Sequence, residues 1–303
     1  MSIDAKHVAN AQKARELYLN NLKPAEASAD WHFAKREARK LVSAAIRASN
    51  CLRDLSGAIK QNCGHTLVFR QLLAPPTSQD QFKLICPSWS KSAENGARPV
   101  RQDIADIVAK SIEDRLDVGL THWVRSSTNP SRRDISTLIR VTATLMAIQK
   151  LATARRSRLA FEQEYAVERL LEANGWTRLP SKLIDTRAAV PPFHFMHKTR
   201  FATETTTPQE VDIACGLPQS YVLAMECKVT NDETNSVKRI NDVLKKASAW
   251  KAHWGSFVMT AALLQGVVAP KDVQRLSDAG VHVFWSHELT EFQDWLSQRM
   301  AQC

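Results

Sequence analysis

The chain has 303 residues, of which 44% are hydrophobic and 24% charged, a composition typical of a soluble globular protein with a substantial core. It contains no run of about eighteen apolar residues, and its N-terminus lacks the basic and then apolar layout of a secretory signal, so we expect a cytoplasmic protein without a membrane span. Six cysteines lie without the short paired spacings of a zinc site or a disulfide framework, which favours reduced thiols.

The net charge of +10 is unevenly distributed along the chain. Residues 1–150 contain 23 Lys and Arg against 14 Asp and Glu, whereas residues 151–303 contain 18 against 17. A basic half beside a nearly neutral half suggests that one part binds a polyanion and the other has a different task. Charge alone does not identify the polyanion, because acidic proteins and anionic membranes attract the same surface as nucleic acids.

The first half of the chain is predicted to be mainly helical. Residues 3–58 are rich in Ala, Leu, Lys, Arg and Glu, which predicts two or three helices interrupted near Lys23-Pro24. Between residues 64 and 99, Pro, Ser, Asn and Gly mark loops around short apolar segments, and we expect a strand or two there. Helical spacing returns at residues 102–116 and 134–174.

One helix in this half carries a basic stripe. Apolar side chains recur at steps of three and four within residues 31–52 and form a face made of Ala38, Leu41, Ala45, Ala48 and Leu52. Arg36, Lys40 and Arg47 fall along another stripe, which can lie against DNA phosphates. A solvated helix surface explains the same pattern, because charged stripes are how helices usually meet water.

After Gly175-Trp176 the pattern changes to strands and helices in alternation. Strands are predicted at residues 193–203, 210–217 and 221–229, followed by an amphipathic helix at 236–254 with Asn235 as its N-cap. A strand at 256–264, a helix at 269–278, a strand at 281–285 and a helix at 288–300 complete the chain. This order predicts an α/β (α+β) fold, in which residues 151–303 form a mixed central sheet with flanking helices and residues 1–150 a mainly helical region.

Two acidic residues and a lysine lie in adjacent predicted strands. Thirteen residues separate Asp212 from Glu226, enough to end one strand, turn and return along an antiparallel neighbour, so the two carboxylates can face each other. Because side chains two apart on a strand share a face, Glu226 and Lys228 point the same way and Cys227 points into the core. Ionisable groups that converge beside apolar neighbours are favoured only where a cation binds among them.

These residue types suit the hydrolysis of a phosphodiester. A hard cation neutralises the charge that develops on the phosphate and generates hydroxide at neutral pH. Mg²⁺ takes oxygen ligands, which explains why Asp212 and Glu226 stand there and not His or Cys. Lys228 would position the attacking water and stabilise the transition state. The alternative interpretation is a surface Asp and a surface Glu/Lys pair on an exposed sheet.

Over about residues 156–285 the chain resembles the PD-(D/E)xK nuclease superfamily. The resemblance rests on an Asp on one strand, a Glu-x-Lys on the next strand and a helix directly after it. Val211 stands where the superfamily's name has proline. The resemblance implies an αβββαβ core. It also implies a fourth acid on the helix before the sheet, for which we choose Glu164 over Glu162 and Glu168, because Glu164 lies at helical spacing with apolar residues. A helix-surface glutamate is the alternative.

A closer resemblance is to the XamI family of type II restriction endonucleases. It rests on the segments Glu226 to Asn231, Thr234 to Asp242, Ala261 to Val267 and Val283 to Leu289, with an echo at residues 73–76. The resemblance implies Mg²⁺-dependent cleavage of double-stranded DNA at a short palindrome, with 5′-phosphate and 3′-hydroxyl ends, and a cognate DNA methyltransferase as genetic partner.

In that light, the start of the helix after the Glu-x-Lys strand would present backbone N–H groups and cations to a DNA phosphate, through Asn235, Ser236, Lys238 and Arg239. Simple capping by Asn235 and a solvated basic turn is the alternative. One site per chain and a palindromic target predict a C₂ homodimer, for which Trp31, Phe33 and Trp89 offer apolar surface.

Two other functions remain open. A repair, recombination or Mrr-like nuclease that recognises DNA structure or modification would use the same site with a different N-terminal reader. A non-catalytic DNA-binding protein would have lost part of the site, and Asp212, Glu226 and Lys228 are all present. The chain contains no phosphate-binding glycine loop and no GxSxG or HExxH motif.

Overall fold

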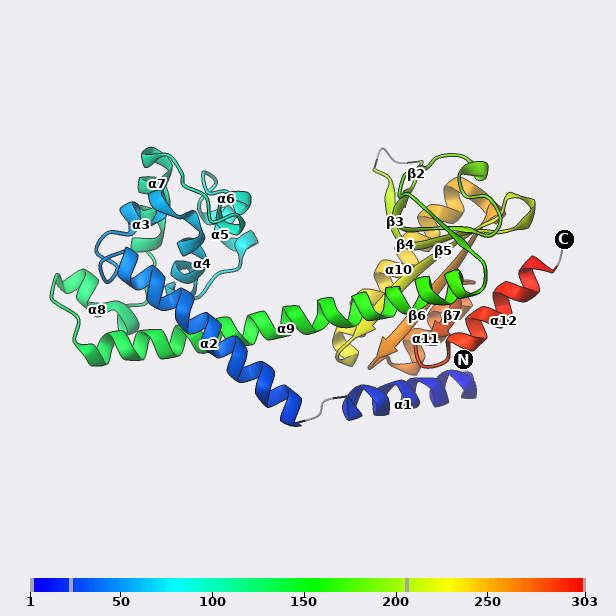
Figure 1. Cartoon of the computed structure of the whole chain (residues 1–303), viewed down its shortest axis with the longest axis horizontal. Coiled ribbons are helices and arrows are strands. Elements are labelled where there is room, and N and C mark those ends of the chain that lie inside the picture. Colours follow the sequence, from blue (N-terminus) through cyan, green and yellow to red (C-terminus); the bar gives the residue numbers. More distant parts are fainter. Residues whose placement is uncertain (1–2, 22–23, 205–206, 302–303) are drawn as a thin grey trace. The chain divides into compact units, whose positions relative to one another are not determined.

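The computed structural model describes residues 3–21, 24–204 and 207–301, and the chain divides into two compact units. One is Pro24–Ala154, and the other combines Met1–Lys23 with Arg155–Cys303 (Figure 1). From the sequence we placed the boundary at residue 150 and kept the first helix with the helical region. Helix α1 (Ala5–Asn20) groups with the second unit because Ala11 and Ala14 are buried in one of its clusters.

The Pro24–Ala154 unit, called here the helical unit, is built from helices around an apolar core. Val42, Phe69, Trp89 and Ile112 are among its fully buried side chains. Its helices are α2 (Pro24–Ala48), α3 (Leu55–Gln61), α4 (Thr66–Phe69), α5 (Gln79–Ile85), α6 (Lys91–Asn95), α7 (Gln102–Glu113), α8 (Val118–Ser126) and the start of α9 (Arg132–Ala173).

Residues 64–99 correct one expectation from the sequence. The strand or two expected there is wrong: this segment forms short helices and turns, and Leu73 makes only an isolated bridge to Leu116. The side chains of Ser78 and Ser90 accept hydrogen bonds at the starts of α5 and α6. Ser in a loop-like sequence therefore acts as an N-cap here, and the sequence pattern does not separate the two uses.

The buried face of α2 also differs from the one expected. It follows Ala34, Ala38, Val42 and Ala45, whereas Leu41 is 46% exposed and Ala48 is exposed. Ala34, Ala38 and Val42 are four residues apart and therefore lie on one side of the helix. Leu41 projects about 100° around the helix from Val42, away from this buried side.

The other unit, called here the sheet unit, contains a mixed sheet, so the predicted fold class is confirmed. In the described part of the chain its seven strands follow the order β1-β3-β4-β5-β6-β7, with β2 paired to β3. β3, β4 and β5 are antiparallel neighbours, while β5, β6 and β7 run parallel. The strands are β1 (Thr177–Leu179), β2 (Leu183–Ile184), β3 (His194–Phe201), β4 (Gln209–Gly216), β5 (Val222–Thr230), β6 (Val258–Gly266) and β7 (His282–Trp285).

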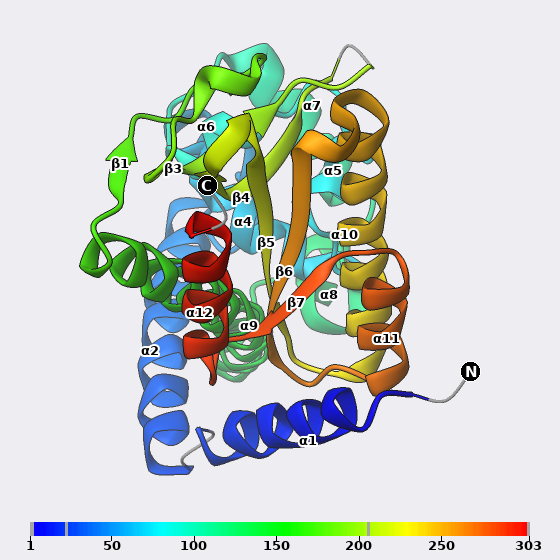
Figure 2. The ribbon, with the colours of Figure 1, turned by 90° about the vertical axis from the view of Figure 1, so that its right-hand side faces the viewer.

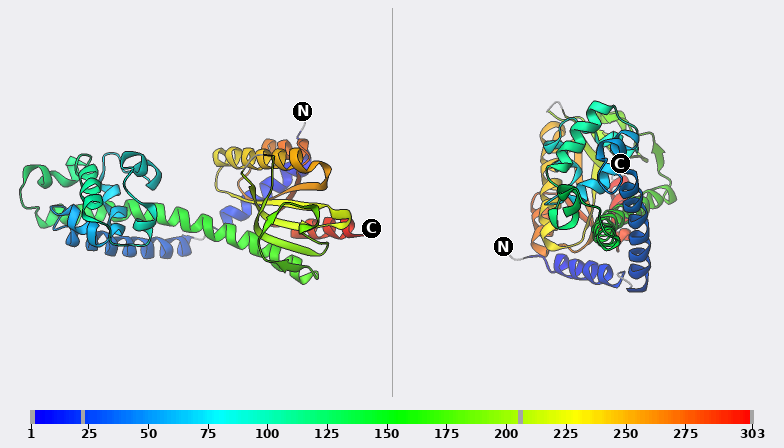
Figure 3. Two further views of the ribbon diagram at one scale, coloured as in Figure 1. Left: turned by 90° about the horizontal axis from the view of Figure 1, so that it is seen from above. Right: turned by 90° about the vertical axis from the view of Figure 1, so that its left-hand side faces the viewer.

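Helices cover both faces of this sheet. α10 (Glu233–Trp254) and α11 (Pro270–Asp278), which connect the parallel strands, lie on one face, and α12 (Leu289–Met300) lies on the other (Figure 2). The same layers can be followed from above in Figure 3. On β5, Leu223, Met225 and Cys227 pack in a cluster with α12 and the end of α9, while Ala224 packs in a cluster with α10. Glu226 and Lys228 therefore belong to the α10 face.

Helix α9 is 42 residues long. By length and composition alone it passes a test for a membrane span, with a mean hydropathy of 1.2 over its most apolar window. Core helices of soluble proteins and signal sequences pass the same test, and 28% of this window is buried. Leu138, Ala143, Met146 and Ala147 of α9 are buried in the core of the helical unit, which accounts for their apolar character.

A buried ion pair gives the helical unit a testable weak point. Arg70 donates to Glu94 at 3.1 and 2.7 Å and to the carbonyl of Thr77, and both side chains are almost fully buried. We predict that Glu94→Ala lowers the free energy of unfolding by about 3–5 kcal/mol, because it leaves the Arg70 charge buried without its partner. Urea denaturation measures the change. The control Asp114→Ala breaks an exposed pair with Lys110 and is expected to change stability little; equal effects of the two variants would contradict the described burial.

Candidate active site

The hairpin of β4 and β5 places Asp212 opposite Glu226. The last pair in the ladder between the two strands is Ile213 with Met225, and the next position along both strands is Asp212 with Glu226. At this point the backbone N–H of Cys227 donates to Oδ2 of Asp212 at 2.7 Å. The end of the ladder thus allows a side-chain carboxylate to take a backbone donor of the neighbouring strand.

The Glu226 carboxylate is fully buried and unevenly hydrogen-bonded. Its Oε2 accepts from Nζ of Lys228 at 2.5 Å and from Nζ of Lys246 at 2.8 Å. Its Oε1 is buried and has no hydrogen-bond partner among the described residues. Burial and the charge of Asp212 raise the pKa of Glu226, and the two lysines oppose the shift. One oxygen of this carboxylate is held by two ammonium groups and the other is left unsatisfied.

Lys228 lies among three carboxylates. Its Nζ is 3.8 Å from Oδ2 of Asp212 and 3.6 Å from Oδ2 of Asp242, in addition to its bond with Glu226. Burial alone would lower the pKa of Lys228, but the charges of Glu226 and Asp212 outweigh it and raise the pKa. Lys228 therefore remains a cation at neutral pH.

Two residues of this group were missed in the sequence. Asp242 and Lys246 lie one turn apart on α10, so their side chains project from the same side of the helix toward β5. The available signal was their position beside Val243 and Ala247, which are buried against the sheet. Charged residues at the edge of a buried helix face are common, so this signal is weak. The distance between Lys246 and Glu226 is known only from the fold.

A second charged group lies on the other face of the sheet. Glu164 of α9 is buried, with its Oε2 2.7 Å from Nε2 of His197 and 3.0 Å from Nζ of Lys198. Glu168, one turn along, is buried as well: its Oε2 lies 3.1 Å from Nη1 of Arg178, and its Oε1 is 2.6 Å from Nδ1 of His197 without hydrogen-bond geometry. We placed Glu168 further round the helix, which is wrong because residues four apart share a side.

Lys198 has an unusual backbone conformation beside Asp212. The pairs His197 with Ile213 and Thr199 with Val211 place Lys198 opposite Asp212 on β3. Its φ of 49° lies in the left-handed region, which is unfavourable for a residue with a Cβ. Both His197 and Lys198 reach Glu164, although neighbours on a regular strand point to opposite faces. The kink thus brings a further lysine to this edge, which periodicity alone does not predict.

The donor set at Asp212 and Glu226 fits a hard divalent cation. Glu226 offers the unsatisfied Oε1, and the Asp212 side chain is 23% exposed, so solvent reaches it. Within the described ranges no group of three or more His, Cys, Asp or Glu side chains is arranged to hold a metal. Two carboxylates completed by backbone, water or phosphate oxygens match the preference of Mg²⁺. Cys227 is buried and its thiol pKa is raised well above the usual value by burial, consistent with a core residue.

The start of α10 is arranged differently from the expected phosphate site. The helix begins at Glu233 with Asp232 as its N-cap, and Asp232 accepts from the backbone N–H of Asn235 at 2.8 Å. The assignment of Asn235 as the N-cap is therefore wrong, and its N–H already has an acceptor. Ser236 is fully buried and hydrogen-bonds Asp272, so it cannot reach DNA. Lys238 is exposed and Arg239 partly exposed in the first turns of the helix.

The basic stripe on α2 is exposed. Lys40 donates to Glu37 at 2.9 Å, and the guanidinium of Arg36 lies 5.5 Å from the centroid of the Phe33 ring. Arg47 is exposed near the end of the helix. Neither contact removes these cations from solvent, so all three remain available to a polyanion.

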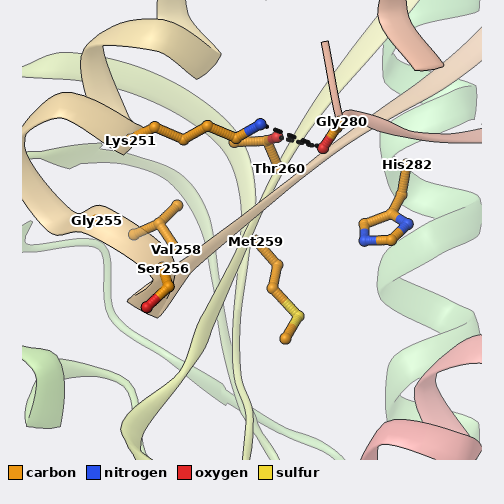
Figure 4. Close-up of a pocket in the computed structure, with 8 residues that line it drawn as sticks. All are labelled: Lys251, Gly255, Ser256, Val258, Met259, Thr260, Gly280 and His282. Atoms are coloured by element: carbon orange, nitrogen blue, oxygen red, sulfur yellow. Dashed lines mark hydrogen bonds between the residues drawn. The ribbon is translucent and has the colours of Figure 1, made fainter. Parts of the chain in front are cut away.

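A cavity of about 380 Å³ lies away from the carboxylates, at the start of β6 (Figure 4). Val258 in its wall pairs with Val222 on β5, whereas Ala262, four residues further along β6, pairs with Glu226. The ammonium of Lys251 donates to the carbonyls of Ala279 at 2.7 Å and Gly280 at 3.3 Å. Lys251 therefore ties α10 to the turn before β7, and we assign it a structural role.

Comparisons with known proteins agree with the resemblance in the sequence. A family model described as XamI restriction endonuclease matches residues 50–285. The type II restriction enzyme XamI of Xanthomonas campestris pv. amaranthicola is 29% identical over 192 residues, which cover 62% of this chain and 66% of that enzyme. The match thus spans slightly less than two thirds of that relative. Protein VC1899 of Vibrio cholerae matches at 11% identity and a TM-score of 0.31, over 88% of this chain and 56% of that chain; so low a TM-score supports no argument about fold or function.

Proposed function

The chain belongs to the XamI restriction endonuclease family, and from this premise we propose that it is a type II restriction endonuclease. It would be a site-specific deoxyribonuclease that hydrolyses phosphodiester bonds of double-stranded DNA at a short palindrome and leaves 5′-phosphate and 3′-hydroxyl ends. The observation that supports this most is the opposition of Asp212 and Glu226 at the end of the β4 and β5 ladder, with Lys228 between them.

In this proposal Asp212 and Glu226 hold Mg²⁺ through carboxylate oxygens, with Oε1 of Glu226 as one ligand. The bound cation supplies charge neutralisation at the phosphate and lowers the pKa of water. Lys228, kept protonated by its acidic neighbours, orients the attacking water and offsets negative charge on the phosphate. Glu164 is the fourth acid of the site; its contact with Lys198, which lies opposite Asp212, supports that role.

As the sequence suggests, we propose that residues 1–150 form the DNA-binding region and residues 151–303 the nuclease core. Residues 24–154, which form the helical unit, carry 19 Lys and Arg against 12 Asp and Glu, so most of the positive excess lies in one compact unit. Lys238 and Arg239 add cations near the site. Arg36, Lys40 and Arg47 precede the segment that the family model matches.

The biological setting follows from the activity. An enzyme that cuts DNA at a short sequence endangers the DNA of its own cell, so we propose a cytoplasmic protein paired with a cognate DNA methyltransferase. A repair, recombination or Mrr-like nuclease would have the same chemistry without a fixed target sequence. A non-catalytic DNA-binding protein is the remaining alternative, and the retained charge of all three central residues disfavours it.

The cleavage reaction separates these functions and tests the site. We predict that the purified chain with Mg²⁺ cuts plasmid into discrete bands, and that Asp212→Ala and Glu226→Ala each abolish cutting while binding to the same DNA persists, because they remove cation ligands. Glu210→Ala is the matched control, since Glu210 lies on the same strand in an exposed pair with Arg200. A smear of products would favour a nuclease without a target sequence, and cutting at a tenth or more of the parent rate by either variant would refute the proposed ligands.

The basic stripe of α2 has its own test. We predict that neutralising Arg36, Lys40 and Arg47 together flattens the dependence of log affinity on log salt concentration by up to about three units, roughly one for each lost phosphate contact. The control neutralises Lys60, Lys91 and Lys110, three exposed cations of the same unit. An unchanged slope in the stripe variant, or an equal change in both, would remove the stripe from the specific interface.

A palindromic target also implies an assembly. We propose that two chains bind across the DNA two-fold axis as a C₂ homodimer, because each chain carries one Asp…Glu-x-Lys site. Phe33 is 54% exposed and remains a candidate for self-association, whereas Trp89 is fully buried and is excluded. Sedimentation with a short cognate duplex in Ca²⁺ should show two chains per duplex. A complex of one chain per duplex that still makes double-strand breaks after transfer to Mg²⁺ would contradict the dimer.

A further inference from the structure

Lys246 is a charged residue of the site to which the proposed reaction assigns no role. Its ammonium is 2.8 Å from Oε2 of Glu226, the oxygen that Lys228 also contacts, and its side chain is only 16% exposed. An ammonium ion is strongly hydrated, so its partial burial is costly unless a nearby charge compensates it. The Glu226 carboxylate needs only one positive charge for neutrality. With Lys228 and Lys246 both beside it, one ammonium group is in excess for Glu226 alone.

The charges of the whole group suggest why both lysines are present. Asp212, Glu226 and Asp242 contribute three negative charges, and Lys228 and Lys246 contribute two positive ones. Glu164 and Lys198, which pair with each other, add one charge of each sign. With one divalent cation and one phosphodiester the group becomes neutral. A second divalent cation would leave an excess of two positive charges in a partly buried site, which is strongly unfavourable.

The oxygen atoms of Glu226 also favour a single cation at this carboxylate. Oε2 of Glu226 is held by two ammonium groups, and Oδ2 of Asp212 accepts the N–H of Cys227. Oε1 of Glu226 is the buried oxygen of the pair that has no partner in the described part of the chain. A second cation bound through the other oxygen of Glu226 would have to approach Oε2, where Lys228 and Lys246 already lie and repel it.

We propose that Lys246 supplies the positive charge that a second divalent cation would otherwise provide, so that the active site works with one cation per chain. The inference rests on the proposed nuclease function and deepens it. Lys246 belongs to α10, which packs against β5, so its position is fixed by the fold and does not depend on a ligand. Lys228 retains its separate place among the three carboxylates.

Equilibrium binding of Mn²⁺ to the full-length protein tests the proposal without DNA. The parent should bind one Mn²⁺ that is lost in Glu226→Gln. Lys246→Met, which keeps the apolar stem and removes the charge, should bind Mn²⁺ at least as tightly as the parent, because a repelling charge is gone. The same variant should cleave DNA in Mg²⁺ about 100-fold more slowly, in the range seen when a charge-stabilising group is removed from an active site.

Two further variants complete the experiment. Lys246→Arg, which keeps the charge, should restore part of the cleavage rate. Lys245→Met, on the neighbouring exposed position of α10, should match the parent in both measurements. Should Lys246→Met fail to fold, the stoichiometry of the parent and the behaviour of Lys246→Arg still decide the question.

The results that overturn the inference are distinct from those that overturn the proposed function. Two Mn²⁺ ions per parent chain, both lost in Glu226→Gln, would refute it, as would weaker Mn²⁺ binding or an undiminished cleavage rate in Lys246→Met. A parent chain that binds one Mn²⁺ at Glu226 but cuts no DNA would instead refute the proposed function and leave the one-cation site in place.

Discussion

The site depends on one constraint, the register of the β4 and β5 hairpin at the point where its ladder ends. If the register shifted by one residue, Asp212 would oppose Met225 or Cys227, and every side chain of one strand would change face relative to the other. The apolar residues fix the register, because Ile213, Cys215, Leu223 and Met225 are buried in one cluster. The carboxylates are thus positioned by the packing of their neighbours, and Asp212 replaces a ladder bond by accepting the N–H of Cys227.

Buried acids require counter-charges, and the helices on the two faces of the sheet meet this need in different ways. On the α10 face, Glu226 is compensated by Lys228 and Lys246. On the α9 face the carboxylates belong to the helix, and β3 supplies His197 and Lys198. A carboxylate without such partners would be protonated or would destabilise the fold. The charged side chains around the hairpin therefore follow from burying acids at the centre of a sheet.

The sequence predicted that Asp212, Glu226 and Lys228 lie together because their placement follows short-range rules. Strand alternation placed Glu226 and Lys228 together, and the loop length set Asp212 opposite Glu226. Lys246 and His197 could not be found in this way, since their contacts join elements that are distant in the chain and depend on how α10 and α9 cross the sheet. Ser236 was misassigned because a helix start has the same sequence pattern whether it faces solvent or a neighbouring helix. In the structure Ser236 faces α11, where its hydroxyl hydrogen-bonds Asp272. The kink at Lys198 has no local sequence signal, as glycine is absent there.

We propose that Asp212 and Glu226 bind the cation that supports DNA cleavage. The most direct test of this proposal is a crystal structure of the protein with Mn²⁺, in which anomalous scattering locates the ion independently of any assumed mechanism. We expect an anomalous peak for an ion that is ligated by Oε1 of Glu226 and by the Asp212 carboxylate, with Lys246 still bound to Oε2 of Glu226. A well-occupied Mn²⁺ ion elsewhere in the sheet unit, with both carboxylates unligated, would contradict it.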